Sequence, residues 1–202
     1  MISNKRINVL GVASSMRIES NSTRTLKLIL DIVKTSYDAE IQILDLRQTI
    51  LPFLYHQEHD KKTEILTAEK MVKWADAFIL ATPDYHGSMS GVMKNFLDHY
   101  WEEFAGKTFG YVCTSHEKGL TVMDQMRTAI RQCYGWSLPY GVSINGELDF
   151  NTKGEIINDL LVKRLDMLAH DLITYGRLIR EQFLKDISNN VLNTFAARYK
   201  VS

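Results

Sequence analysis

The segment from Thr82 to Gly91 combines the residue types that let a protein backbone approach a bound ligand closely. It reads Thr-Pro-Asp-Tyr-His-Gly-Ser-Met-Ser-Gly and joins an apolar run over 77–81 to a helical pattern over 92–101. Loops at the carboxyl ends of such buried strands are where open α/β sheets bind ligands. This loop can press backbone N–H groups against a flat ligand with polar edges. We therefore expect binding by the main chain here, rather than catalysis by a side chain.

A second polar segment, from Ser14 to Thr23, follows a strand-like run and leads directly into a helical pattern. It carries four serines and Arg17 at the position where helix N–H groups point outward without partners. Such an end binds anions, and an arginine adds charge-assisted hydrogen bonds. The plain alternative is that Ser22 or Thr23 only caps the helix. The additional presence of Ser15, Arg17 and Ser20 favours a phosphate site.

Strand-like and helical patterns alternate along the whole chain. Strands are expected over 7–13, 41–46, 77–82, 108–113 and 136–144, and Pro139 favours an edge position for the last. An apolar stripe from Ile157 to Ile179 predicts a long final helix. The alternation predicts an α/β fold of the doubly wound, flavodoxin-like type, with five parallel strands in the order 2-1-3-4-5 and helices on both faces. The loops after strands one, three and four then converge, and the flat ligand expected there is a flavin.

Composition argues against several classes of partner. The 202 residues include 24 basic and 24 acidic side chains, so no net field favours nucleic acid or an anionic membrane, and a small acidic electron carrier is disfavoured. Cys113 and Cys133 fit no metal spacing and no disulfide framework, which makes the cytoplasm the expected compartment. Neither a signal peptide nor an apolar run long enough to cross a bilayer is expected.

At these two loops the chain resembles the NADPH-dependent FMN reductase family. The family's first loop typically reads G-S-x-R-x-x-S, and here Ser14 replaces the glycine in an otherwise matching segment. Its second loop typically reads T-P-E-Y-H-G-S-x-P/S-G-x-L-K-N-x-L-D, which residues 82–98 follow closely with Asp84 in place of glutamate. The resemblance extends over about residues 5–180.

The resemblance implies a role for each loop. In the first, the FMN phosphate would be held by Ser15, Arg17, Ser20, Ser22 and Thr23. In the second, the edge of the ring system would be lined, largely through backbone atoms, by Pro83, Asp84, Tyr85, His86 and Gly87. In the third, Thr114 and Ser115 would approach the cofactor. His116-Glu117-Lys118-Gly119 departs from the paired glycines that the family often has there.

The resemblance further implies an FMN-dependent NAD(P)H oxidoreductase that transfers hydride from NADPH or NADH through bound FMN to free flavin, quinone, azo or metal-oxyanion acceptors. The flavin carries the electron chemistry, so no side chain is obligatory. His86 is expected first as a backbone or ring-edge contact, and a proton donor is the minor alternative. The alternative function is an FMN-binding electron carrier or redox-responsive interaction module without NAD(P)H oxidation; a third reading is a structural domain with an unused site.

Several other features have two interpretations. Lys94 and Asp98, four residues apart on a helix, form either an exposed ion pair or an intersubunit contact. The aromatic residues of the same region, Phe96, Tyr100, Trp101 and Phe104, belong either to the core or to a homo-oligomer interface formed by the helix after Gly91. His56 and His59 could suggest a metal site, but solvated surface is favoured and no metal is expected.

We expect one flavodoxin-like FMN-binding reductase domain over residues 1–185. The tail over 186–202 is weakly patterned. It is expected either to wrap a partner subunit or to be disordered.

Overall fold

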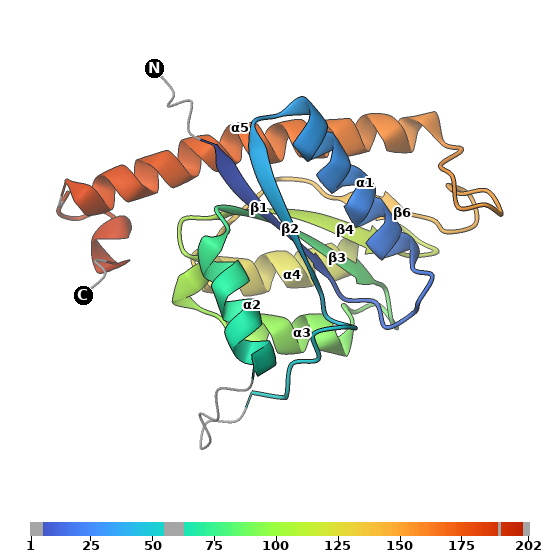
Figure 1. Ribbon diagram of the computed structural model, residues 1–202, viewed down its shortest axis with the longest axis horizontal. Helices are drawn as coiled ribbons and strands as arrows, with labels where there is room; N and C mark the ends of the chain where they lie inside the picture. Colours follow the sequence, from blue (N-terminus) through green and yellow to red (C-terminus); the bar gives the residue numbers. More distant parts are fainter. Residues whose placement is uncertain (1–5, 55–62, 190, 200–202) are drawn as a thin grey trace.

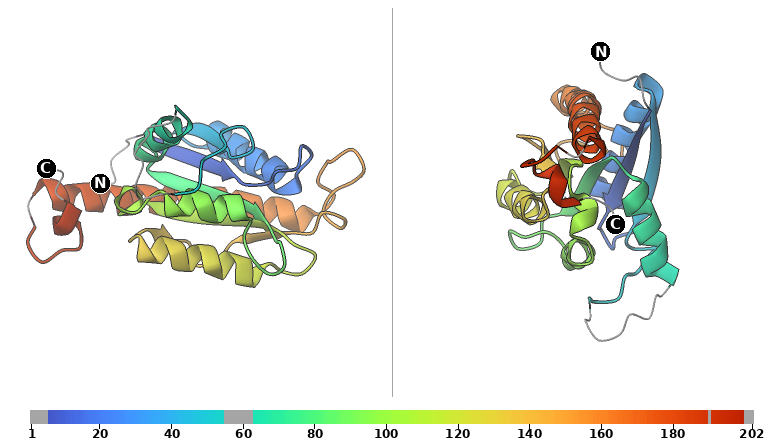
Figure 2. Two further views of the ribbon diagram at one scale, coloured as in Figure 1. Left: turned by 90° about the horizontal axis from the view of Figure 1, so that it is seen from below. Right: turned by 90° about the vertical axis from the view of Figure 1, so that its left-hand side faces the viewer.

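A computed structural model of the protein describes residues 6–54, 63–189 and 191–199. A parallel sheet runs through the middle of the molecule with helices on both faces (Figures 1 and 2). Its strands are β1 (Ile7–Ala13), β2 (Ala39–Asp45), β3 (Ala77–Pro83), β4 (Thr108–Thr114) and the short β5 (Trp136–Ser137). They lie in the order β2-β1-β3-β4-β5. The predicted strand order is confirmed.

The edge beyond β4 differs from the prediction. A single fifth strand over 136–144 is wrong, because the segment forms two short strands, β5 and β6 (Val142–Ile144), which both pair with β4. Pro139 lies between them, and proline has no backbone N–H for a ladder. The sheet is therefore six-stranded by count, with a broken edge strand.

Burial explains which strands are central. The first six residues of β3 and of β4 are all buried, as expected for strands covered on both faces. Alternate residues of β3 enter different cores: Phe78 and Leu80 face one side of the sheet, whereas Ile79 and Ala81 face the other. In β2, at the edge, only Ala39 and Leu44 are buried, and the other five residues are partly or fully exposed.

Two helices cover one face and three cover the other. Helices α1 (Asn21–Ser36) and α5 (Asp159–Ser188) pack with the Ile79 side of the sheet. Helices α2 (Thr63–Trp74), α3 (Gly91–Asp98) and α4 (Leu120–Gln132) pack with the Phe78 side. The short 3₁₀ helix η1 (Glu102–Phe104) follows α3. The helix predicted to begin near Ile157 begins instead at Asp159, and Ile157 is exposed.

Residues after α5 fold back onto the protein. The 3₁₀ helix η2 (Ala196–Tyr199) lies in a small core with Phe183 and Ala105. The ring of Tyr134 is tilted against that of Phe195 and meets that of Tyr199 edge to face. The predicted domain boundary at 185 and the two roles suggested for the tail stay predictions, although residues 186–188 continue α5.

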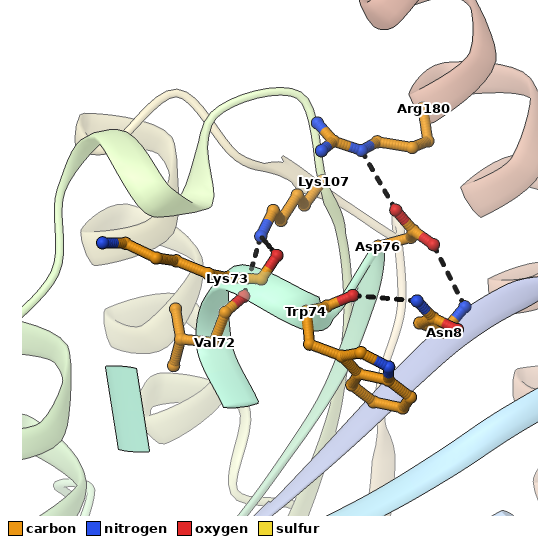
Figure 3. Close-up of polar contacts among 7 residues, drawn as sticks. All are labelled: Asn8, Val72, Lys73, Trp74, Asp76, Lys107 and Arg180. Atoms are coloured by element: carbon orange, nitrogen blue, oxygen red, sulfur yellow. Dashed lines mark hydrogen bonds and ion pairs between the residues drawn. The ribbon is translucent and has the colours of Figure 1, made fainter. Parts of the chain in front are cut away.

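The amino ends of the strands carry a polar network of their own (Figure 3). Lys107 is buried beside α2, and its Nζ donates hydrogen bonds to the carbonyl oxygens of Val72 at 2.8 Å and Lys73 at 3.5 Å. Asp76 accepts from Arg180 of α5 at 3.1 Å and from the backbone N–H of Asn8 at 3.1 Å. This network lies at the opposite end of the sheet from the loops discussed below.

Candidate active site

The loops after β1, β3, β4 and β6 lie at the carboxyl ends of the strands (Figure 1). Residues of these loops line a cavity of about 690 Å³. Its size is within the range of small-molecule and cofactor sites. The residues that line it are Ser15, Arg17, Glu19, Ser20, Asn21, Ser22, Pro83, Asp84, Tyr85, Gly87, Thr114, Ser115, His116, Glu117, Gly146 and Glu147. The three loops that the sequence predicted to converge therefore do so around one space.

Ser14, the departure from the family's glycine, joins the first loop to the second. Its hydroxyl donates to the carbonyl oxygen of Ala81 at 3.0 Å. The Ser90 hydroxyl, which caps α3, donates to the Ser14 carbonyl oxygen at 2.9 Å. Ser14 is fully buried and does not line the cavity, so its hydrogen bonds connect the two loops from behind the cavity wall.

The start of α1 combines capping with an open cationic side chain. The Ser20 hydroxyl accepts a hydrogen bond from the Thr23 backbone N–H at 3.3 Å, and it lies 2.9 Å from the Ser22 hydroxyl. The predicted cap at Ser22 or Thr23 is wrong, because Ser20 is the N-cap and the other two residues lie inside α1. Arg17 is exposed on the cavity wall, and among the described residues no carboxylate forms an ion pair with it. A helix N-terminus with a free guanidinium beside it suits a phosphate.

The second loop forms a tight hairpin. Tyr85 and Ser88 exchange backbone hydrogen bonds of 2.9 and 3.1 Å, and the two residues between them, His86 and Gly87, have φ angles of 57° and 75°. Two positive φ values in a two-residue turn define a type I′ geometry. Tyr85 and Gly87 line the cavity, but His86 does not.

Asp84 uses both carboxylate oxygens within the protein. One accepts from the Gly87 backbone N–H at 2.8 Å, and the other accepts from the Ser115 hydroxyl at 2.8 Å. The Asp84 backbone N–H in turn donates to the Thr114 carbonyl oxygen at 2.8 Å. Asp84 lies on the cavity wall as predicted, and its hydrogen bonds lock the second loop to the third.

Thr114, at the end of β4, has a side-chain hydroxyl that the other described residues do not satisfy. Its Oγ1 is buried and forms no hydrogen bond with any described residue. A buried hydroxyl without a partner costs roughly 1–3 kcal/mol. Thr114 is also one of the residues that line the cavity.

The sequence profile of the NADPH-dependent FMN reductase family matches residues 7–148. The chain belongs to the NADPH-dependent FMN reductase family. The matched residues include the first three loops of the cavity, and the predicted cofactor pair, FMN and NADPH, is that of the family.

Individual relatives agree with this membership. The NADPH azoreductase of Bacillus sp. (strain OY1-2) is 30% identical over 111 residues, which are 53% of this chain and 62% of that protein. The FMN-dependent NADPH-azoreductase of Staphylococcus saprophyticus subsp. saprophyticus is 28% identical over 123 residues, 56% of this chain and 64% of that protein. The chain thus spans just under two thirds of the length of each of these two curated relatives.

Solved structures confirm the predicted flavodoxin-like fold. The flavoenzyme NAD(P)H:(acceptor) oxidoreductase FerB from Paracoccus denitrificans superposes with a TM-score of 0.71 at 16% identity, covering 85% of this chain and 98% of that one. The apo form of an NADH:FMN oxidoreductase, EMOB, has a TM-score of 0.68 at 18% identity, covering 85% and 89%. A Streptococcus pneumoniae flavodoxin has a TM-score of 0.57 at 15% identity, covering 83% and 98%. At these identities the likeness concerns the fold alone.

The residues on the cavity wall fit the family's cofactor. Serine hydroxyls, a helix N-terminus and Arg17 lie together at one part of the wall, as a phosphate group needs. The Thr114 hydroxyl offers an unused hydrogen-bonding group. Gly87 leaves open space where any larger residue would project a side chain.

Ten of the twelve residues predicted for the cofactor line the cavity; Thr23 and His86 do not. Residues missed by the prediction are Glu19, Asn21, His116, Glu117, Gly146 and Glu147. The last two follow β6, and the turn pair Asn145-Gly146 directly after a strand was the available signal. Their position depends on contact with α1, since a Cβ on Gly146 would lie 2.4 Å from the Asn21 side-chain nitrogen.

The remaining candidates outside the cavity are also placed. Lys94 and Asp98 form an exposed ion pair on α3. Phe96, Tyr100 and Phe104 are buried in the core, which leaves Trp101 as the exposed aromatic residue of that region, at 63%.

His56 and His59 lie outside the described residues, and within the described ones no group of three or more His, Cys, Asp or Glu side chains could hold a metal. No helix in the described part of the chain is long and apolar enough to cross a membrane.

Proposed function

We propose that this protein is an FMN-dependent NAD(P)H oxidoreductase that acts on a small-molecule acceptor: free flavin, a quinone, an azo compound or a metal oxyanion. The observation that carries the proposal is the cavity. Its wall includes the N-terminus of α1 with Arg17, the hairpin that contains Gly87, and Thr114, whose hydroxyl has no hydrogen-bond partner among the described residues. The family membership and the similarity to NADPH-azoreductases support it.

Each loop has a part in this function. Ser15, Arg17, Ser20, Ser22 and the N–H groups at the start of α1, near Thr23, would hold the phosphate. The hairpin, with Pro83, Asp84, Tyr85, His86 and Gly87, would lie along the edge of the ring system. Thr114 and Ser115 would close the third side. When bound, FMN supplies a hydride acceptor that can pass its electrons on to a second molecule, so the protein's work is to bind and orient it.

His86 retains a specific part in the proposal. Among the described residues its backbone N–H and C=O form no hydrogen bond, whereas those of Tyr85 and Gly87 are in use. We assign to it a backbone contact with the cofactor edge and leave proton donation as the secondary role.

We also propose that the protein is cytoplasmic and self-associates through α3. Two free cysteines, one of them buried, suit a reducing compartment. The exposed Trp101 beside α3 is the kind of residue enriched at interfaces. Sedimentation equilibrium of the purified protein tests the self-association, and a monomer at all concentrations would reject it.

The test of function is steady-state oxidation of NADPH and of NADH by the FMN-loaded protein, with FMN, a quinone, an azo dye and chromate as separate acceptors. Turnover with at least one acceptor is expected, and no turnover with any would remove the proposal. Anaerobic rapid mixing with NADPH separates the electron-carrier alternative. Fast bleaching of the flavin supports the enzyme, whereas slow or absent bleaching supports the carrier.

A further inference from the structure

Gln125, on α4, contacts the outer side of the hairpin over residues 85–88. It is half-buried and was not among the residues predicted for the site. Its side-chain amide makes three hydrogen bonds to the second loop. Oε1 accepts from the Ser88 hydroxyl at 2.8 Å and from the Met89 backbone N–H at 3.4 Å, and Nε2 donates to the Gly87 carbonyl oxygen at 3.1 Å.

The amide group suits this position because it offers an acceptor and a donor side by side. Ser88 and Met89 present hydrogens, and Gly87 presents a carbonyl oxygen. A carboxylate could satisfy the first two but would repel the third, since it has no hydrogen to donate. An apolar side chain could satisfy none of them.

The hairpin borders a second cavity on this side. A cavity of about 650 Å³ opens between α3 and α4, and Ser88, Met89 and Gln125 all lie on its wall. Figure 2 shows the two helices next to each other on the same face of the sheet. The hydrogen bonds from Gln125 link the hairpin directly to α4 beside this cavity.

The turn needs such a link, because His86 has a φ of 57°, which costs a non-glycine residue about 1 kcal/mol or more. Strained residues persist where the surroundings fix them from several sides. Asp84 fixes Gly87 from the cavity side through its N–H, and Gln125 fixes the same residue from the α4 side through its C=O. Tyr85 and Gly87 are thereby held on the cavity wall.

We propose that Gln125 is a positioning residue for the cofactor: it locks the 85–88 hairpin in the conformation that forms one wall of the cavity. This inference rests on the proposed function, because it assigns the hairpin to FMN. Gln125 itself does not line the cofactor cavity, so it acts through Gly87, Ser88 and Met89.

The first test compares Gln125→Ala with Gln132→Ala, a matched control at the exposed end of the same helix. Hydrogen–deuterium exchange of the apo protein reports the hairpin without any flavin. We expect faster exchange at residues 85–89 in Gln125→Ala only, and FMN binding about tenfold weaker in that variant. Equal exchange in the two variants, or faster exchange with an unchanged Kd for FMN, would overturn the proposal.

The second test uses the near-isosteric Gln125→Glu variant and its pH profile. At pH 7.5 the carboxylate cannot donate to the Gly87 oxygen, so FMN binding is expected to be weak. Protonation on lowering the pH to about 4, just below the ordinary glutamate pKa of about 4.3, restores an O–H donor, and the affinity relative to Gln132→Glu is expected to rise. A ratio that stays flat across this range contradicts the lock.

The two proposals fail in different ways. If the wild type binds FMN but does not oxidise NAD(P)H, the proposed function falls while the lock is still judged by exchange and by FMN affinity. If the wild type oxidises NAD(P)H and Gln125→Ala matches Gln132→Ala in both hydrogen–deuterium exchange and FMN affinity, only the positioning role of Gln125 is rejected.

Discussion

Arg17 and Thr114 both line the cavity. Among the described residues, the Arg17 guanidinium has no ion-pair partner and the Thr114 hydroxyl has no hydrogen-bond partner. Their neighbours differ: Ser20 caps α1, and Asp84 ties two loops together. Polar residues on one cavity wall therefore divide into those that build the site and those that are free to bind. A ligand gains most from the second kind, because it does not compete with existing contacts.

Arg17→Ala is expected to weaken FMN binding by about 1.5–3 kcal/mol, since a charge-assisted contact to phosphate is lost. Riboflavin, which lacks the phosphate, should bind the variant and the wild type equally. Arg131→Ala, at the far end of α4, is the control for loss of a surface charge. Fluorescence quenching gives all the affinities. Equal FMN affinity in wild type and Arg17→Ala would place the phosphate elsewhere.

The sequence indicated the residue types of the site but not this division of work. Ser15, Arg17 and Ser20 could be predicted because a polar run before a helix has a local meaning. The hydrogen bond between Ser90 and Ser14 joins residues 76 positions apart in the sequence, and the one between Ser88 and Gln125 joins residues 37 positions apart. Neither pairing leaves a local pattern in the chain, so only the fold reveals it.

At the scale of the element, helices and hairpins end at local caps and turns, although the sequence prediction put the α1 cap at Ser22 or Thr23, two or three residues too late. Ser20 and Ser90 cap α1 and α3, and the His86-Gly87 pair forms the turn of the hairpin. The loop after β6 escaped prediction because tertiary contacts place it. There, Arg24 of α1 lies 5.8 Å over the ring of Phe150.

The hairpin makes a specific demand on Gly87, and Gly91 provides the comparison. A Cβ at either position would meet nothing within 4 Å, but only Gly87 has a positive φ, of 75°. Gly87→Ala should therefore lower the free energy of unfolding by about 1 kcal/mol through backbone strain alone. Gly91→Ala, at the start of α3, should be neutral or raise it by up to about 1 kcal/mol. Urea denaturation of both variants measures this, and equal shifts would refute the strain argument.

At the scale of the whole molecule, the two ends of the sheet have different tasks. The carboxyl ends of the strands open into the cavity, where Arg17 and Thr114 keep unused polar groups. The amino ends are closed by Lys107, Asp76 and Arg180, which connect α2, α5 and the central strands (Figure 3). Substitutions at the amino end are therefore expected to change stability while leaving FMN binding nearly unchanged.

Lys107 makes that expectation measurable through pH. Burial, with a smaller effect of Arg180, lowers the pKa of its amine from 10.5 to about 7, while Asp76 and Glu103 act in the opposite direction. Between pH 7 and 10.5 the unfolded chain therefore binds more protons at this residue than the folded protein. Stability must rise with pH in that window, and the cost of burying the charge is fully present below pH 7. The expected rise from this group between pH 7 and 8.5 is about 2 kcal/mol.

Other groups limit the usable window. Burial raises the pKa of the Cys113 thiol from 9.0 to about 12, so above pH 9 that group makes stability fall as pH rises. The measurement is therefore the difference in unfolding free energy between wild type and Lys107→Met from pH 7 to 8.5. Lys70→Met, on the exposed side of α2, is the control, and its unfolding free energy should change with pH as that of the wild type does. If the unfolding free energy of Lys107→Met changes with pH as steeply as that of the wild type, the Lys107 amine does not titrate between pH 7 and 8.5. The hydrogen bonds to the carbonyl oxygens of α2 would then keep the amine charged in this range.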